Sequence, residues 1–150
     1  VAQFCATLGA AEDDEAKQHE YYNRAVAIYE GASTYSRGNR LLQWSARDYN
    51  LRAIICKLAV GDFEGDDGAE ARLETYCEQD PSFPATKECK LANQIVDAFR
   101  DLDVEALAEA TQDYDQRSRL DQWKVAQLLQ VRQLMQRLRA EELGEEEDDE

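Results

Sequence analysis

Apolar side chains recur at intervals of three and four residues along most of the chain, the spacing that places them on one face of an α-helix. The first two sets are Val1, Phe4, Cys5 and Leu8, then Tyr22, Ala25, Val26 and Tyr29. Nowhere do β-branched residues alternate with polar residues for long enough to indicate a strand. The pattern therefore predicts an all-α protein.

Turn residues divide this pattern into separate helices. We expect a turn bracketed by Gly31 and Gly38, a long third helix that ends near Gly61, and a loop over residues 65–68.

Two prolines mark the middle of the chain. Asp80 ends a short helix because Pro81 excludes helical geometry from the residue before it. Pro84 is expected in the first turn of the following helix. Asp103 is expected to cap the helix after that through its carboxylate.

Two helices carry apolar side chains around more than one face. The third has Leu41, Trp44, Leu51, Ile55 and Leu58. The last has Leu120, Trp123, Leu128, Val131, Leu134, Met135 and Leu138 in one sector, with Val125 and Leu129 outside it. This breadth predicts that the third helix lies between two neighbours and that two partners clasp the front half of the last helix.

Helix pairs recur about every 40 residues, close to the length of tetratricopeptide repeats. We therefore predict a tetratricopeptide-like antiparallel helical array, an α-solenoid, over residues 1–80. A C-terminal helical bundle is expected to close it over residues 81–143, followed by an acidic disordered tail over residues 144–150.

Charge is distributed unevenly in a chain with a net charge of −15. Residues 117–139 hold six basic side chains and one acid, Asp121, whereas residues 141–150 hold eight acids and no base. The negative total repels a duplex, and no basic stripe interleaved with aromatic residues would follow its phosphates. We expect no nucleic-acid partner.

Catalytic and metal-binding patterns are missing from the sequence. It has no glycine-rich phosphate loop, no nucleophile with a plausible histidine base, and no metal-ligand spacing. The one histidine, His19, is expected on a solvated helix face. Four widely spaced cysteines are expected to be reduced core residues: Cys5, Cys56, Cys77 and Cys89. We predict no enzyme activity, no cofactor and no metal.

Membrane-spanning and export signals are also missing, which predicts a cytosolic protein. The first residue is Val1, and the helical pattern starts with it, as expected of a piece of a longer protein.

Four strings, in this order and spacing, resemble the C-terminal half of the soluble NSF attachment proteins, closest to the alpha and Sec17-like branch. They occupy residues 22–30, 41–49, 83–91 and 114–123, and the last, Tyr-Asp-Gln-Arg-Ser-Arg-Leu-Asp-Gln-Trp, is the most specific. The resemblance covers nearly the whole chain. It implies a twisted sheet of antiparallel helices and an adaptor that lays a concave face on the four-helix SNARE bundle. The C-terminal end would meet the N-terminal domains of the NSF ATPase.

The resemblance also implies SNARE-binding residues. Arg47 and Lys87 fall on positions where the family carries basic contacts, with Lys at the first and Arg at the second, so the two types are exchanged here. Lys90 lies in the same string as Lys87. The positive charge is kept, although arginine and lysine differ in the contacts that they can make.

The ATPase-binding residues implied by the resemblance lie at the end of the chain. They are Leu143, Glu145, Glu146, Glu147, Asp148, Asp149 and Glu150. Family tails commonly place a leucine after the acidic run, whereas here Leu143 precedes it. The resemblance further implies a cytoplasmic protein that touches membranes peripherally through an N-terminal half that this chain lacks.

An alternative is a general helical-repeat scaffold that captures a peptide, such as a chaperone tail. It requires polar and basic residues that converge on one carboxylate. The candidates are Asn23, Arg24, Asn39 and Arg40.

Overall fold

The computed structural model describes the backbone of residues 1–148 and the side chains of residues 1–144. Its helices are α1 (Ala2–Ala11), α2 (Glu15–Arg37), α3 (Gln43–Ala59), α4 (Ala69–Gln79), α5 (Lys87–Arg100), α6 (Val104–Arg117) and α7 (Gln122–Asp148). A short 3₁₀-helix, η1 (Phe83–Ala85), precedes α5. No strand occurs in this part of the chain, and the predicted all-α class is confirmed.

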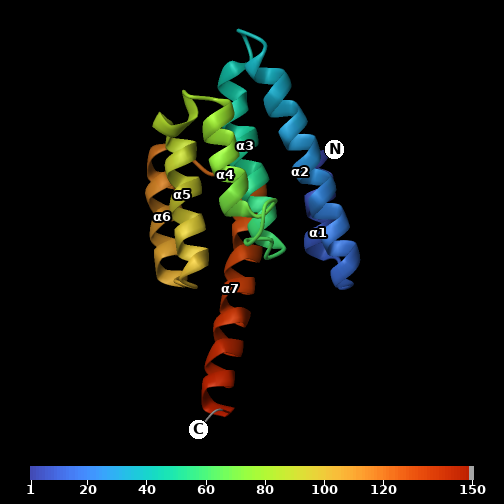
Figure 1. Cartoon of the computed structure of the whole chain (residues 1–150), viewed down its shortest axis with the longest axis vertical. Helices are drawn as coiled ribbons and strands as arrows, with labels where there is room; N and C mark the ends of the chain where they lie inside the picture. Colours follow the sequence, from blue (N-terminus) through green and yellow to red (C-terminus); the bar gives the residue numbers. More distant parts are fainter. Residues whose placement is uncertain (149–150) are drawn as a thin grey trace.

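The helices lie side by side in antiparallel hairpins, as Figure 1 shows. Helix α2 packs against α1 and α3, and α5 packs against α6, α3 and α4. Helix α7 contacts α3, α1 and α6, and its C-terminal part projects beyond all the other helices (Figure 1). The predicted helical array closed by C-terminal helices is confirmed.

A single hydrophobic core extends through the array from Ala2 to Met135. It crosses residue 80, where the sequence suggested a boundary between repeats and bundle. Residues 50–59 of α3 are buried around the whole helix, as its apolar breadth predicted. The prediction is wrong for the start of this segment, because Leu41 is 89% and Trp44 is 64% exposed.

Local chemistry explains several helix ends. At the end of α3, Gly61 has a positive φ of 75°, and the N–H of Asp62 donates to the carbonyl of Lys57. Such a left-handed residue is the usual end of a helix, and glycine adopts it without steric cost. The carboxylate of Asp103 accepts the N–H of Ala106 at 3.0 Å, so the predicted cap of α6 is confirmed.

Two predicted helix boundaries are wrong. Gly31 lies inside α2, which continues to Arg37, so the turn is confined to residues 38–42. Pro84 belongs to η1, and α5 begins at Lys87 with the hydroxyl of Thr86 capping its first turn. Packing of α2 against two neighbours outweighs the modest helix cost of one glycine.

The second apolar row on α7 is not clasped, contrary to the prediction. Val125 is 53% and Leu129 is 50% exposed, whereas Val131 and Met135 are fully buried. The row faces a shallow apolar groove beside α6 that also contains Leu107.

Helix α7 continues to Asp148, past the boundary at residue 143 suggested by the sequence. Asp149 and Glu150 lie outside the described residues. The subdivision at residues 80 and 143, with a disordered tail, stays a prediction.

Replacing Met135 by Ala should lower the free energy of unfolding by about 2–5 kcal/mol, because its side chain is fully buried and the change leaves a cavity. Urea unfolding followed by circular dichroism measures it. The matched control on the same helix is Leu129→Ala, expected to change stability by about 0.5 kcal/mol. Equal losses in the two variants would contradict the packing described for α7.

Candidate interface around the start of α7

Helices α3 and α7 meet through a cluster of four charged side chains. The segment that joins α6 to α7 lies at this contact. Arg52 pairs with Asp121, and its Nε donates to Asp48 at 2.7 Å. The ammonium of Lys124 donates to the other oxygen of Asp48 at 2.5 Å and lies 3.6 Å from Asp121. We call Asp48, Arg52, Asp121 and Lys124 the charge cluster.

Both cations of the charge cluster are nearly buried, since Arg52 is 8% and Lys124 is 6% exposed. Burial alone would raise the pKa of Asp121, but the backbone N–H of Lys124 and the guanidinium of Arg52 lower it below its usual value. Burial likewise opposes ionisation of Arg52, but its hydrogen bonds to Asp48 and Asp121 raise its pKa. These two partners therefore hold each other in the charged state.

Aromatic rings cover one side of the charge cluster. The guanidinium of Arg52 lies 4.9 Å from the ring centroid of Trp123, within the range of a cation–π interaction. The Trp123 ring meets Tyr29 edge to face, with centroids 5.6 Å apart. Trp123 thus joins α7 to α2 as well as to α3.

The three predicted SNARE-binding residues lie on the surface around this junction. The guanidinium of Arg47, next to Asp48 on α3, lies 4.3 Å from the ring centroid of Trp44. Lys87, in the first turn of α5, donates from Nζ to the hydroxyl of Ser118 at 2.7 Å. Lys90 lies 3.9 Å from a carboxylate oxygen of Asp113. We call Arg47, Lys87 and Lys90 the basic rim.

Tyr114 is a buried residue of α6, four positions before Ser118. Burial raises its pKa to about 12, and the charges of Glu88 and Asp48 add to that effect. Near the end of α6, Ser118 accepts the hydrogen bond from Lys87 of α5, and Asp121, three residues further on, pairs with Arg52 of α3.

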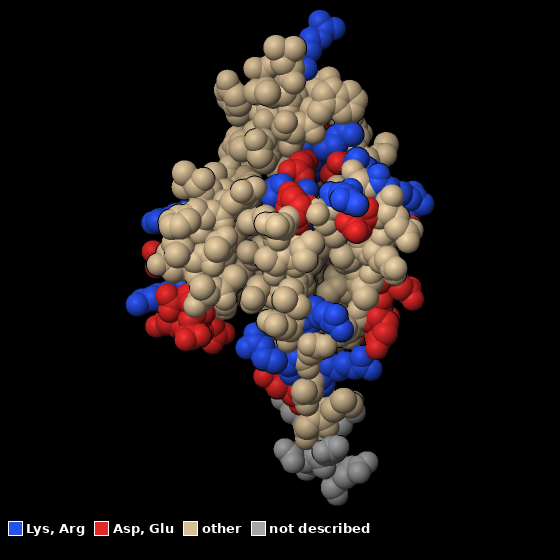
Figure 2. Space-filling view, turned by 180° about the vertical axis from the view of Figure 1, so that it is seen from behind, with Lys and Arg blue, Asp and Glu red and all other residues tan. Residues whose placement is uncertain are grey.

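The charged surface around these elements is mixed in sign. Figure 2 shows acidic and basic side chains interspersed in the upper part of one face. A second set of basic side chains gathers lower down, around α7 above its end (Figure 2). Arg132, Arg137 and Arg139 are the exposed basic residues of that helix.

Only part of the predicted ATPase-binding set is described. Leu143 is 54% exposed on the projecting part of α7. The side chains of Glu145, Glu146, Glu147, Asp148, Asp149 and Glu150 lie outside the described residues. Their predicted role stays a prediction.

The candidates for a peptide-binding site do not converge. Asn23 and Arg24 lie in the middle of α2, whereas Asn39 and Arg40 lie beyond its end. At about 1.5 Å per residue the two pairs are separated by roughly 20 Å, too far to hold one carboxylate. Asn39 instead accepts the N–H of Leu41 at 3.0 Å.

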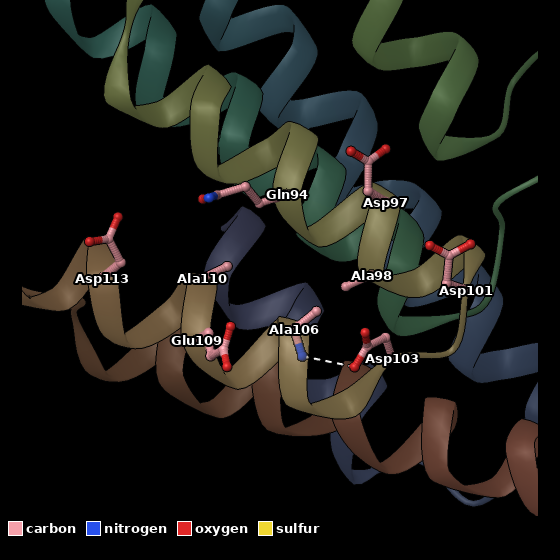
Figure 3. A pocket seen from close by; sticks show the side chains of 9 residues that line it. All are labelled: Gln94, Asp97, Ala98, Asp101, Asp103, Ala106, Glu109, Ala110 and Asp113. Carbon is pink, nitrogen blue, oxygen red and sulfur yellow. Dashed lines mark hydrogen bonds between the residues drawn. The ribbon is translucent and has the colours of Figure 1, made fainter.

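An acidic cleft of about 430 Å³ lies between α5 and α6, which are in contact. Its carboxylates come from Asp97, Asp101, Asp103, Glu109 and Asp113. Figure 3 shows them spread along the cleft, with Asp103 engaged in capping Ala106. Within the described residues, no group of three or more His, Cys, Asp and Glu could hold a metal ion. None of the described helices has the length and apolar character needed to cross a bilayer.

Sequence reasoning missed the charge cluster, although a local signal for it exists. Arg52 follows Asp48 by four residues and Lys124 follows Asp121 by three, the spacings at which helical side chains meet. Each pair taken alone is typical of a solvated helix face. Their mutual burial depends on a contact between residues 69 positions apart.

The fold defines an α-helical array with charged side chains exposed on its surface. A family model described as soluble NSF attachment protein, SNAP, matches residues 5–136. The chain belongs to that family.

Individual relatives agree with the family match. A beta-soluble NSF attachment protein of Bos taurus is 36% identical over 121 residues, 81% of this chain and 39% of the relative. An alpha-soluble NSF attachment protein of Vitis vinifera is 37% identical over 149 residues, 99% of this chain and 45% of the relative. The vesicular-fusion protein SEC17 of Komagataella phaffii is 38% identical over 109 residues, 73% of this chain and 36% of the relative. The chain spans less than half the length of these relatives.

Asp121→Asn should lower the free energy of unfolding at pH 7 by about 1–2 kcal/mol. The amide keeps an oxygen that can accept the N–H of Lys124 but loses the charge facing Arg52. The estimate is modest because the Asp121 side chain is 43% exposed and solvent screens the pair.

The effect of Asp121→Asn should depend on pH. Since the folded-state pKa of Asp121 lies below its unfolded value of about 4, its stabilisation is present above pH 4 and is lost as the pH falls through the folded-state pKa. Urea unfolding between pH 7 and pH 2 should show the difference between wild type and variant shrinking. Asp97→Asn, at a carboxylate that is 66% exposed, is the control and should cost less than 1 kcal/mol. A pH-independent difference would contradict the assignment.

Proposed function

We propose that this chain acts as an adaptor that binds the SNARE complex and recruits and stimulates the NSF ATPase, which disassembles that complex in vesicle fusion and intracellular protein transport. Family membership supports the proposal, as do the names of relatives that describe NSF attachment and vesicular fusion. The role is that of a non-catalytic adaptor.

The observation that carries the proposal is the basic rim on an otherwise acidic chain. With a net charge of −15, the chain as a whole repels an acidic partner. Attraction must therefore come from cations that lie within about one Debye length, roughly 8–10 Å, of the partner. The basic rim offers such cations, with Arg47 on α3, which the charge cluster ties to α7, and Lys87 and Lys90 on α5. A syntaxin-type four-helix SNARE bundle with an acidic surface is the partner that we propose for it.

Exposed aromatic surface beside Arg47 adds to this site. Trp44 is 64% exposed and lines a shallow pocket with Arg37, Arg47 and the end of α4. Tryptophan and arginine are the side chains that most often dominate the binding energy of protein interfaces. Trp44 also stacks on the Arg47 guanidinium and so restricts its orientation.

The C-terminal end of the chain has features that suit contact with the second proposed partner, the NSF ATPase. Helix α7 projects past its neighbours, and the sequence ends in eight acids within ten residues. We propose that this end, with Leu143, meets basic N-terminal domains of the NSF ATPase in a salt-sensitive contact. We place the action in the cytoplasm, with peripheral membrane contact coming from the part of the relatives that this chain does not span.

Reversing the charge of Arg47 and Lys87 together, by R47E and K87E, should weaken binding to a reconstituted SNARE bundle about tenfold or more at physiological salt. Isothermal titration with the purified bundle measures the change. The matched control is K17E with R24E on α2, which alters the net charge equally on exposed residues outside the rim. If both pairs of substitutions weakened SNARE binding equally, or if R47E with K87E did not weaken it, the basic rim would not be the contact site.

Removal of residues 144–150 should reduce recruitment of the NSF ATPase to SNARE-bound chain by several-fold, because it deletes six of the eight terminal acids. Co-sedimentation of the ATPase, with SNARE binding measured in parallel, tests it. SNARE binding should be unchanged. Unchanged ATPase recruitment would contradict the proposal and would indicate that the terminal acids contribute only to solubility.

A further inference from the structure

Two cysteines meet at the corner between α4 and α5. Cys77 lies near the end of α4, Cys89 lies in the first turn of α5, and their sulfur atoms are 3.7 Å apart. A disulfide requires about 2.05 Å, so the sulfurs need to approach by about 1.7 Å. The connecting residues include Pro81 and Pro84. All four cysteines of the chain are free in the structure.

The two sulfurs differ in access to solvent. Cys77 is half-buried, whereas Cys89 is 1% exposed. Burial and the contact with Cys77 raise the pKa of the Cys89 thiol to about 12, and the amide of Asn93 donates to its sulfur at 3.4 Å. A reagent from solvent therefore reaches Cys77 first, while Cys89 stays protonated beside it. Cys5 and Cys56 are both buried.

We propose that Cys77 and Cys89 form a reversible intramolecular disulfide when the chain meets hydrogen peroxide. The thiolate of Cys77 attacks one peroxide oxygen, the O–O bond breaks, and a sulfenic acid forms on Cys77 as hydroxide leaves and takes up a proton to become water. The sulfur of Cys89 then attacks the Cys77 sulfur, the S–O bond breaks, and the hydroxyl leaves with the Cys89 proton as a second water. The peroxide gains the two electrons that the two thiols lose, and a small dithiol reverses the reaction.

The bond would cross-link the end of α4 to the start of α5, next to Lys90 and two residues from Lys87. Closing this short loop restricts the unfolded chain, so the melting temperature should rise by about 5 °C in the oxidised form. The modification is a property of the chain itself, whether or not the basic rim binds SNAREs.

Peptide mapping of the 150-residue chain tests the proposal directly. The chain is treated with hydrogen peroxide, its remaining thiols are alkylated in denaturant, and trypsin is added without reductant. Cleavage after Arg72, Lys87 and Lys90 places the two cysteines in separate peptides, 73–87 and 88–90. These two peptides should be found joined, with an intact-mass loss of about 2 Da that dithiothreitol restores.

Variants define the order of the steps. Cys89→Ala should stop at the Cys77 sulfenic acid, which dimedone traps, whereas Cys77→Ala should leave Cys89 available for alkylation. Cys5→Ala, on α1, is the matched control and should cross-link as the wild type does. Two results with the wild-type chain would overturn the proposal. In one, Cys77 is oxidised to the sulfinic acid; in the other, Cys77 forms a disulfide with a second chain while Cys89 can still be alkylated.

Discussion

Two nearly buried cations at the crossing of α3 and α7 impose the constraint on which the rest of the arrangement depends. Arg52 and Lys124 can lie there only if Asp48 and Asp121 face them, because an unpaired charge at such a site costs several kcal/mol. These pairs hold the start of α7 against α3. Ser118, to which Lys87 donates, lies three residues before Asp121 of this cluster.

The sequence predicted the helices well, because their apolar periodicity reports a buried face and needs no knowledge of the partner. Ends set by local chemistry, such as Gly61 and the Asp103 cap, were correct for the same reason. Errors arose where neighbours decide the outcome. Gly31 is carried through α2 by packing of that helix on both sides, and Val125 stays exposed because it faces the groove beside α6 and not the core.

The site was less accessible from sequence than the fold. Arg47 and Lys87 were assigned from a family resemblance, and their roles remain proposals. Their common surroundings depend on contacts between distant segments: 31 residues separate Lys87 from Ser118, and 69 separate Arg52 from Asp121. The periodic spacing of apolar residues carries no information about contacts between such distant segments. The exposure of Trp44 was likewise not predictable, because an apolar residue at helical spacing usually faces the core.

The sequence at the projecting end of α7 has the opposite charge from the one that a helix C-terminus favours. The peptide dipoles give a helix C-terminus partial negative charge, yet the last turn of α7 has no basic residue and the sequence there is acidic. The end of this helix therefore carries electrostatic strain that a cationic surface would relieve. A cationic surface in contact with this end would therefore favour the helical conformation of the last turn of α7.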